Sequence, residues 1–342
     1  MTESTRGHGV QLLWNKGIAS LCDWRIPNEF EDSGRYSSVP AFAGAMSSPK
    51  LPDNLISDPT VFENIRDGEL VWVRVSWLRS FVKQVLPLTK ARFVLVTGDS
   101  DSSTPSELPR EANAILNSPE LLHWYAQNYD GSRPQGRISP VPIGIDFHML
   151  SQGGIWGENS VSPMEQQEIL TSIAQSLPPL TNRIRKVYVD FGWQRAFFFR
   201  RYRFLHPLPG AKFRESRSEI ARKLSHNADV FFQPGPLPRS EMWRRRGEYA
   251  FVLSPHGNGL DCHRTWEALA LGHIVLVPSS SLDSLYSDLP VVPLKSWSDI
   301  RPENLEKWIH LFREIPRPCE KLESSYWIEI MRAKAKNRDR IF

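Results

Sequence analysis

The stretch EYAFVLSPHGNGLDCHRTWEALALGHIVLVP, residues 248–278, holds a complete strand–loop–helix–strand pattern. Its first part, YAFVL, is the kind of apolar run found in strands that are buried on both faces. A helix is predicted over DCHRTWEALALG, with Asp261 as its N-cap and Gly272 as the residue that ends it. HIVLVP, 273–278, predicts the next strand. Buried strands joined by helices indicate a parallel sheet covered by helices.

The same alternation occurs on both sides of a Gly-, Ser- and Pro-rich linker at 149–163. Before the linker we expect strands at 70–78, 91–101 and 137–146, and helices at 79–88 and 118–128. After it we expect strands at 185–191, 228–234, 248–255, 273–278 and 290–294, and helices at 164–177, 215–226, 239–247, 261–272, 301–315 and 324–338. The pattern predicts an α/β fold of two Rossmann-like lobes facing a cleft. The predicted boundaries are 1–148 (with 1–60 poorly defined), 149–182 for the linker and its helix, 183–300 for the second lobe, and 301–342 for the C-terminal helices.

Composition restricts the class of protein. The chain has 342 residues and a net charge of only +4, which gives no reason to expect a nucleic-acid-binding protein. Its three cysteines, Cys22, Cys262 and Cys319, form no CxxC pair, so neither a disulfide framework nor a zinc-binding motif is indicated. The N-terminus lacks a signal-peptide pattern, and no apolar run approaches the roughly 20 residues that span a bilayer. We expect a soluble, cytoplasmic protein with no membrane span.

The loop between the strand and the helix has the composition of a phosphate-binding site. Glycines let backbone N–H groups and a helix N-terminus approach an anion. On the helix, His263, Arg264 and Glu267 are spaced to share one side. This order suits a nucleotide diphosphate at the helix start and ribose hydroxyls beside the carboxylate. The loop is neither a dinucleotide fingerprint, because Cys262 stands where the third glycine would be, nor a Walker loop.

These residues carry a resemblance to a known family. FVLSPHGNGLDCHRTWEALALGHIVLV resembles the donor-binding segment of exostosin-like glycosyltransferases, which have the two-lobed GT-B fold. The resemblance covers about 228–300, is weaker at LHWYAQNYD and PVPIGID, and is absent over 1–60. It implies an enzyme, a hexosyl- or pentosyltransferase, that moves a sugar from a nucleotide-sugar to an acceptor hydroxyl by direct displacement, with no cofactor and no metal. The family often has a basic residue after Ser-Pro, where this chain has His256.

The resemblance and the loop chemistry together give a predicted donor site in the second lobe and an acceptor side in the first. The predicted donor-binding residues are Arg201, Ser254, His256, Gly257, Asn258, Gly259, His263, Arg264 and Glu267. The Arg in FFFRRYRF is included because related lobes hold the diphosphate with a cation from that region. Two alternatives stay open. One is a nucleotide-sugar epimerase or hydrolase on the same architecture, and the other is a non-catalytic protein that binds sugar nucleotides or RNA.

The catalytic base is predicted from strand ends. Ligands of open parallel sheets bind outside the carboxyl ends of the strands, and Asp99 follows such an end, with Asp130 as its rival. Asp146 is interpreted as structural, and WRRRGE at 243–248 as surface. Two metal patterns are weighed and not adopted. They are Asp99-x-Asp101, and the His263–Glu267 pair, for which the sequence shows no third ligand.

Overall fold

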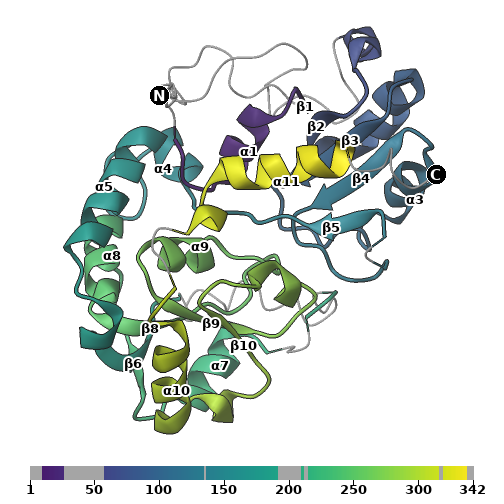
Figure 1. Cartoon of the computed structure of the whole chain (residues 1–342). Coiled ribbons are helices and arrows are strands. Elements are labelled where there is room, and N and C mark those ends of the chain that lie inside the picture. The colour runs from purple at the N-terminus through teal and green to yellow at the C-terminus, as the bar shows by residue number, and fades with distance from the viewer. Residues whose placement is uncertain are drawn as a thin grey trace.

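The computed structural model of the chain describes residues 10–26, 58–134, 136–191, 209–211, 215–315 and 319–336. Their strands form two sheets of five, and within each sheet all neighbouring strands run parallel (Figure 1). The first sheet contains β1 (Trp24–Ile26), β2 (Glu69–Arg74), β3 (Phe93–Gly98), β4 (Leu121–Ala126) and β5 (Ile138–Pro140), in that order. The second has the order β10 (Val291–Leu294), β9 (Ile274–Pro278), β8 (Tyr249–Leu253), β6 (Ile184–Val189) and β7 (Val230–Phe232).

Helices connect and cover these strands. The α-helices are α1 (Asn15–Leu21), α2 (Leu78–Ser80), α3 (Pro109–Asn117), α4 (His148–Gln152), α5 (Pro163–Ser176), α7 (Arg217–Leu224), α8 (Arg239–Gly247), α9 (His263–Ala270), α10 (Pro302–Phe312) and α11 (Ser324–Lys336). Short 3-10 turns lie at Pro59–Asn64, Val75–Trp77, Leu86–Leu88, Leu180–Asn182, Asp283–Tyr286, Trp297–Asp299 and Glu320–Leu322, and Phe81–Val85 forms a π-helical turn.

The C-terminal helices divide between the two lobes. α10 packs on β6 and β9 of the second sheet, whereas α11 packs on α1 and on β2, β3 and β4 of the first (Figure 1). The chain therefore returns to the first lobe after completing the second. A buried residue of α11, Met331, belongs to the same apolar cluster as the first sheet.

The two sheets differ in strand order. The first runs in chain order from edge to edge among the described strands. In the second, β6 lies between β7 and β8, so the order reverses between β6 and β8. Such a reversal is a topological switch point, and ligands of open α/β sheets bind outside the carboxyl ends of the strands at this place. The loop that follows β8 is the one singled out in the sequence.

The structure confirms the α/β architecture of two lobes, each built on a parallel sheet, that the sequence predicts, and corrects one element. Residues 118–128 were expected to be helical, but β4 (Leu121–Ala126) is a strand in the interior of the first sheet. All six residues of β4 are buried. A strand covered on both faces shows no alternation, so periodicity cannot separate it from a buried helix. The helix of this region is α3, which directly precedes it.

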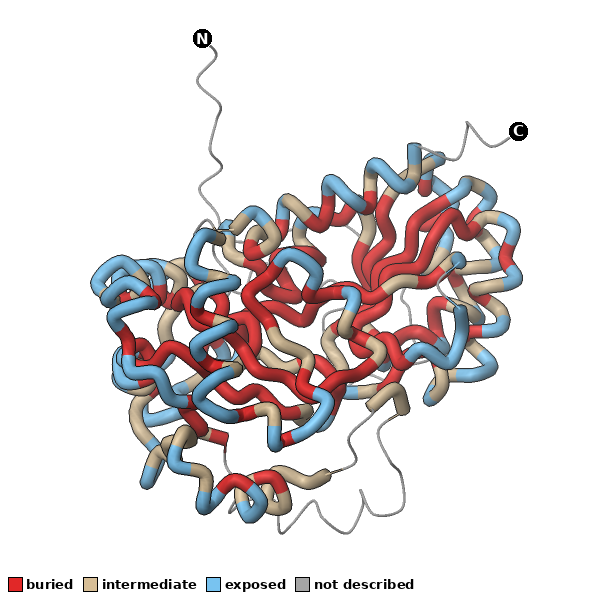
Figure 2. The backbone as a smooth tube through the Cα atoms, turned by 60° about the horizontal axis from the view of Figure 1, so that its bottom comes forward, coloured by how far each residue is buried: buried red, intermediate tan, exposed pale blue. Residues whose placement is uncertain are grey.

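The lobes meet in a packed junction rather than through an isolated linker. One apolar cluster contains most of the first-lobe core and continues into Trp266 of α9 and Val275 of β9. Figure 2 shows buried backbone running through both lobes. A second cluster fills the interior of the second sheet and α10. Among the described residues, no helix has the length and apolar character needed to cross a membrane.

Candidate functional site

The loop after β8 is folded on itself. Ser254 is buried, and its hydroxyl oxygen accepts a hydrogen bond from the Thr265 hydroxyl at 2.9 Å. The Gly257 N–H donates to the Gly259 carbonyl at 3.0 Å, and the His256 ring Nδ1 lies 2.8 Å from the Leu260 carbonyl oxygen. A carbonyl only accepts, so this His256 nitrogen carries the proton. The loop is thus held in one shape by its own groups, with Asn258 exposed at its tip.

The far end of the loop contacts the first lobe. A Cβ on Gly259 would lie 2.5 Å from the Asn128 side-chain nitrogen, so the close approach requires glycine. The next contacts are made by Asp261, whose N–H donates to the Asn128 side-chain oxygen at 2.9 Å and whose carboxylate accepts from the Ile143 N–H at 2.8 Å. Burial raises the pKa of Asp261 to about 6, against the lowering effect of its hydrogen bonds. Asp261 is not the N-cap predicted from the sequence. That position is Cys262, and the carboxylate is used to join the lobes.

Two arginines flank the loop from the second lobe. The Arg264 Nε donates to Asp190 at 2.6 Å, immediately after β6, and Arg264 keeps 18% of its side chain exposed. The Arg217 Nε donates to the His256 carbonyl at 3.3 Å. Arg217 is the first residue of α7, placed by a capping box in which Ser216 and Glu219 bond to each other's backbone N–H groups. Sequence reasoning missed it, although the S-x-x-E signal of a helix start was present.

Of the other predicted second-lobe residues, Arg201 lies outside the described residues, and Glu267 lies in a buried ion-pair network. Arg239 donates to one Glu267 oxygen at 2.8 Å, while the Trp243 indole and Arg246 contact the other at 3.3 and 3.5 Å. Burial raises the pKa of Glu267, but the two guanidinium groups outweigh it and lower the pKa overall. Contact with a ribose stays a prediction, since the carboxylate already has three protein partners.

The same network corrects the assignment of 243–248 to the surface. Arg246 is 1% exposed and contacts Asp190 through its Nε at 3.0 Å. Burial alone would raise the pKa of Asp190. The positive charges of Arg246 and Arg264 lower the pKa by more than burial raises it, so its value is about 2. Trp243 is also buried, whereas Arg244 and Arg245 are exposed as expected. These last two line a surface hollow of about 620 Å³ with Phe231, Gln233, Pro234, Leu237, Glu241 and Glu248, away from the loop after β8.

The carboxyl edge of the first sheet holds a second charged group. Asp99 follows β3 in the left-handed backbone region, with φ of 59°. Its carboxylate accepts from Lys16 and from the Arg74 Nε, both at 2.6 Å. Burial raises the pKa of Asp99, but these two cations hold it well below its usual range. A base with so low a pKa accepts protons weakly near neutral pH, so this environment disfavours Asp99 as the catalytic base.

The rival carboxylate is engaged in local structure. Asp130 is buried, and its two oxygens accept the N–H groups of Ser106 and Ser132 at 2.9 and 2.8 Å. These contacts are those of a turn-stabilising side chain. The assignment of a base to either residue stays a prediction.

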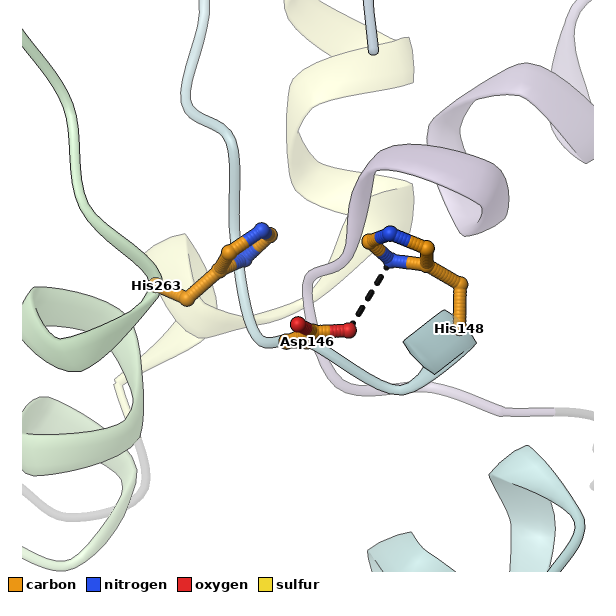
Figure 3. A group of neighbouring side chains, drawn as sticks. All are labelled: Asp146, His148 and His263. Atoms are coloured by element: carbon orange, nitrogen blue, oxygen red, sulfur yellow. Dashed lines mark ion pairs between the residues drawn. The ribbon is translucent and has the colours of Figure 1, made fainter. Parts of the chain in front are cut away.

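Asp146 lies next to two histidines from separate elements. Together with His148 and His263 it forms a group whose ligand-type atoms all lie within 4.8 Å of one another (Figure 3). The sequence indicated His263 and Glu267 as a pair. In the structure Glu267 pairs with the buried arginines, and His263 faces the first lobe. Of the Asp-x-Asp pair, Asp101 is exposed while Asp99 is ion-paired.

Comparison with known proteins gives similarity of structure only. No protein-family model matches the chain, and no curated protein matches its sequence. A UDP-forming α,α-trehalose-phosphate synthase from Burkholderia xenovorans is 10% identical with a TM-score of 0.36, over 81% of this chain and 75% of that one. A glycosyltransferase from Rickettsia africae is 12% identical with a TM-score of 0.36, over 85% and 84%. An α-glucosyltransferase in complex with UDP is 11% identical with a TM-score of 0.30, over 82% and 80%. Similarity at this level does not establish a family, and the resemblance to exostosin-like enzymes stays a prediction.

Proposed function

We propose that the chain is a glycosyltransferase that binds a nucleotide-sugar donor in its second lobe and an acceptor hydroxyl at the first. The observation that carries the proposal is the position of the 254–261 loop, which leaves β8 at the topological switch point between β6 and β8. A glycine loop leading into a helix at this place supports binding of an anionic phosphate group.

The residues around the loop have distinct proposed roles. The Gly257 and Asp261 N–H groups already have protein partners, so the proposed diphosphate contacts are the N–H groups of His263 and Arg264 in the first turn of α9. Arg217 and Arg264, which flank the loop, supply the positive charge that the sequence left unassigned after His256. As the bond to the sugar breaks, negative charge grows on the departing diphosphate, and fixed cations and amides stabilise it. The diphosphate is therefore proposed to bind without a metal ion.

The neighbouring buried charges keep this arrangement rigid. Asp190 holds Arg264 on one side and Arg246 on the other. Arg246 in turn contacts Glu267, so the first two turns of α9 are fixed relative to β6 and α8. A site whose charges are already oriented does not need to reorganise when the donor reacts. In this proposal Glu267 supports the site indirectly, through its contact with Arg246. Its predicted direct role is a hydrogen bond to the ribose of the donor.

The test is a thermal-shift panel of UDP, GDP, CMP and dTDP and their sugars, with a chelator present. At a ligand concentration one hundred times its dissociation constant, stabilisation of roughly 2.7 kcal/mol is expected for the correct nucleotide. Arg217→Gln should weaken its binding by roughly ten- to a hundred-fold, the value of one charge-assisted hydrogen bond. Arg222→Gln, an exposed arginine on the same helix, is the matched control and should change nothing.

Two results would count against the proposal. If no nucleotide stabilises the protein, the loop is not a donor site. If Arg217→Gln and Arg222→Gln weaken binding equally, the effect is one of general charge. Turnover of the donor without an acceptor would favour the epimerase or hydrolase alternative instead.

A further inference from the structure

Three side chains with metal-ligand chemistry converge where the lobes meet. Asp146 and His148 lie at the start of α4 in the first lobe, and His263 is the first residue of α9 in the second. Figure 3 shows the two imidazole rings on opposite sides of the Asp146 carboxylate. One ligand-type atom from each residue lies within 4.8 Å of the other two. Tetrahedral zinc ligands are separated by about 3.3 Å, which follows from metal–nitrogen distances near 2.0–2.1 Å. Small side-chain shifts would therefore close the group around one ion.

The orientation of His263 is fixed in the way that metal-binding histidines are usually fixed. Its Nδ1 lies 2.7 Å from the Gly144 carbonyl oxygen, which can only accept, so Nδ1 carries the proton. The lone pair is then on Nε2, the nitrogen available to an ion. The backbone at Gly144 is paired with the N-terminal segment through a bridge to Trp14, and the Ile145 N–H donates to the Leu13 carbonyl at 2.8 Å. The approach is so close that a Cβ on Gly144, which has φ of 71°, would lie 2.5 Å from that oxygen.

The other two residues are also held in place. Asp146 accepts from the Met149 N–H at 3.0 Å, and its backbone carbonyl accepts from the buried Arg239. The His148 Nδ1 lies 2.9 Å from an Asp146 carboxylate oxygen. The side chains of Asp146 and His148 keep 9% and 19% of their surface exposed, so an ion from solvent can reach the group.

The cations around the group are themselves paired with carboxylates. Arg239, which donates to the Asp146 carbonyl, pairs with Glu267. Lys16 and Arg74 both pair with Asp99, and these pairs lower the positive potential that a divalent ion would meet. Asp146 supplies the negative charge, and the histidines supply neutral nitrogen ligands when deprotonated.

We propose that Asp146, His148 and His263 bind one divalent transition-metal ion of the zinc and cobalt class, which joins the two lobes. Two imidazoles and one carboxylate favour such ions over Mg²⁺ and Ca²⁺, which prefer oxygen ligands. Three protein ligands leave a coordination position for water or a bound molecule. This assignment gives the ring of His263 to the ion in place of its predicted donor contact, while the backbone N–H groups of the first turn of α9 stay with the proposed diphosphate site. Binding of the ion does not require a nucleotide.

The experiment uses the full chain, freed of metal by chelation and kept without nucleotide. Co²⁺ is titrated while the visible absorption of the bound ion is followed, and Zn²⁺ binding is measured by calorimetry. One equivalent of Co²⁺ should bind, and the bound ion should show the visible absorption of a site with four or five ligands. His148→Ala and His263→Ala should each weaken binding by more than the roughly 10–100-fold that loss of an outer-shell partner costs, since each removes a direct ligand. His310→Ala is the matched control, because His310 is an exposed histidine on α10 that is not part of the group, and this variant should bind Co²⁺ as the unchanged protein does.

Binding that survives in both variants, or that falls equally in the His310→Ala control, would overturn the proposal. Should His263→Ala fail to fold, the half-buried His148 still provides the test. The absence of any saturable binding would overturn it as well. All readouts are made without nucleotide, so a negative result leaves the glycosyltransferase proposal untouched, and failure of nucleotide binding leaves the metal site untouched.

Discussion

The carboxyl edges of the two sheets carry similar charges in different surroundings. In the first lobe, Asp99 and Arg74 pair while keeping 14% and 20% of their side chains exposed. In the second, Asp190 and Arg246 pair with 2% and 1% exposed. The second-lobe pair is sealed from water and is part of the fold, whereas the first-lobe pair can still meet a ligand. Exposure, more than residue type, separates charges that hold the protein together from charges that are available for function.

The largest expected effect on stability comes from breaking the buried ion pairs of Asp190, Arg246 and Glu267, which we call the sealed group. Arg246→Met removes the cation shared by Asp190 and Glu267, which leaves two carboxylates short of a partner in the interior. Losing one partner of a buried pair destabilises a protein by about 3–5 kcal/mol. Urea unfolding of both proteins measures the difference.

An exposed pair serves as the control for that measurement. Arg185 and Glu306 have 58% and 60% of their side chains exposed, so Arg185→Met should cost about 0–1 kcal/mol. If the two substitutions lower the free energy of unfolding by the same amount, the buried ion pairs stabilise the protein no more than an exposed pair does. The comparison between the two sheet edges would then be wrong.

The sealed group should also give a pH signature. The pKa of Asp190 is lowered to about 2, against about 3.9 in an unfolded chain. The stabilising contribution of Asp190 is therefore complete above about pH 4 and is lost as the pH falls towards 2. A shift of this size corresponds to roughly 2–3 kcal/mol. The stability difference between the unchanged protein and Asp190→Asn should shrink by this amount between about pH 5 and pH 2, and a constant difference would contradict the assignment.

Glu267→Gln is expected to cost less than Arg246→Met. The amide that replaces the carboxylate keeps the shape of the side chain and can accept one hydrogen bond. The negative charge that faces Arg239 and Arg246 is lost. Hydrogen bonds to charged groups contribute about 1.5–3 kcal/mol, and the unfolding free energy should fall by about that much. The sequence alone predicts no effect on the fold, because the residue shares a helix side with His263.

The predicted ribose contact of Glu267 needs a separate measurement. Calorimetric titration of both proteins with a donor and its 2′-deoxy analogue forms a double-mutant cycle. If Glu267 bonds the 2′-hydroxyl, the two losses will not add. Additive losses would leave Glu267 with its structural contacts alone.

Much of the fold could be predicted because most strands and helices have clear local patterns. α8 (Arg239–Gly247) and β9 (Ile274–Pro278) were expected within a residue of their observed bounds. β4 was missed because burial on both faces removes the alternation that marks a strand.

The site was less predictable, because its residues come from separate elements. His263 acquires its neighbours Asp146 and His148 only when the lobes meet. From the sequence, Arg246 is predicted to be one of three surface arginines. In the structure its helix packs on α5 and β8, and this packing buries the side that carries Arg246. Sequence spacing shows which residues share a helix side, and it does not show what that side will face.

Asp99→Asn tests the first-lobe group, in which only part of the charge reaches water. The substitution breaks the pairs with Lys16 and Arg74. Water can solvate the separated arginine, which is 20% exposed, but not Lys16, which is 1% exposed. Because the amide oxygen can still accept one hydrogen bond, the cost should be about 1.5–3 kcal/mol, less than that of Arg246→Met. Its effect on turnover decides the role of Asp99. A general base contributes roughly 10²–10⁴-fold to the rate, and the depressed pKa of Asp99 argues that its loss will cost less than that. Donor turnover should therefore fall by less than about a hundred-fold while donor affinity stays the same. A larger loss of turnover, with affinity unchanged, would restore Asp99 as the base, and it would mean that an approaching acceptor displaces the two cations and raises the proton affinity of the carboxylate.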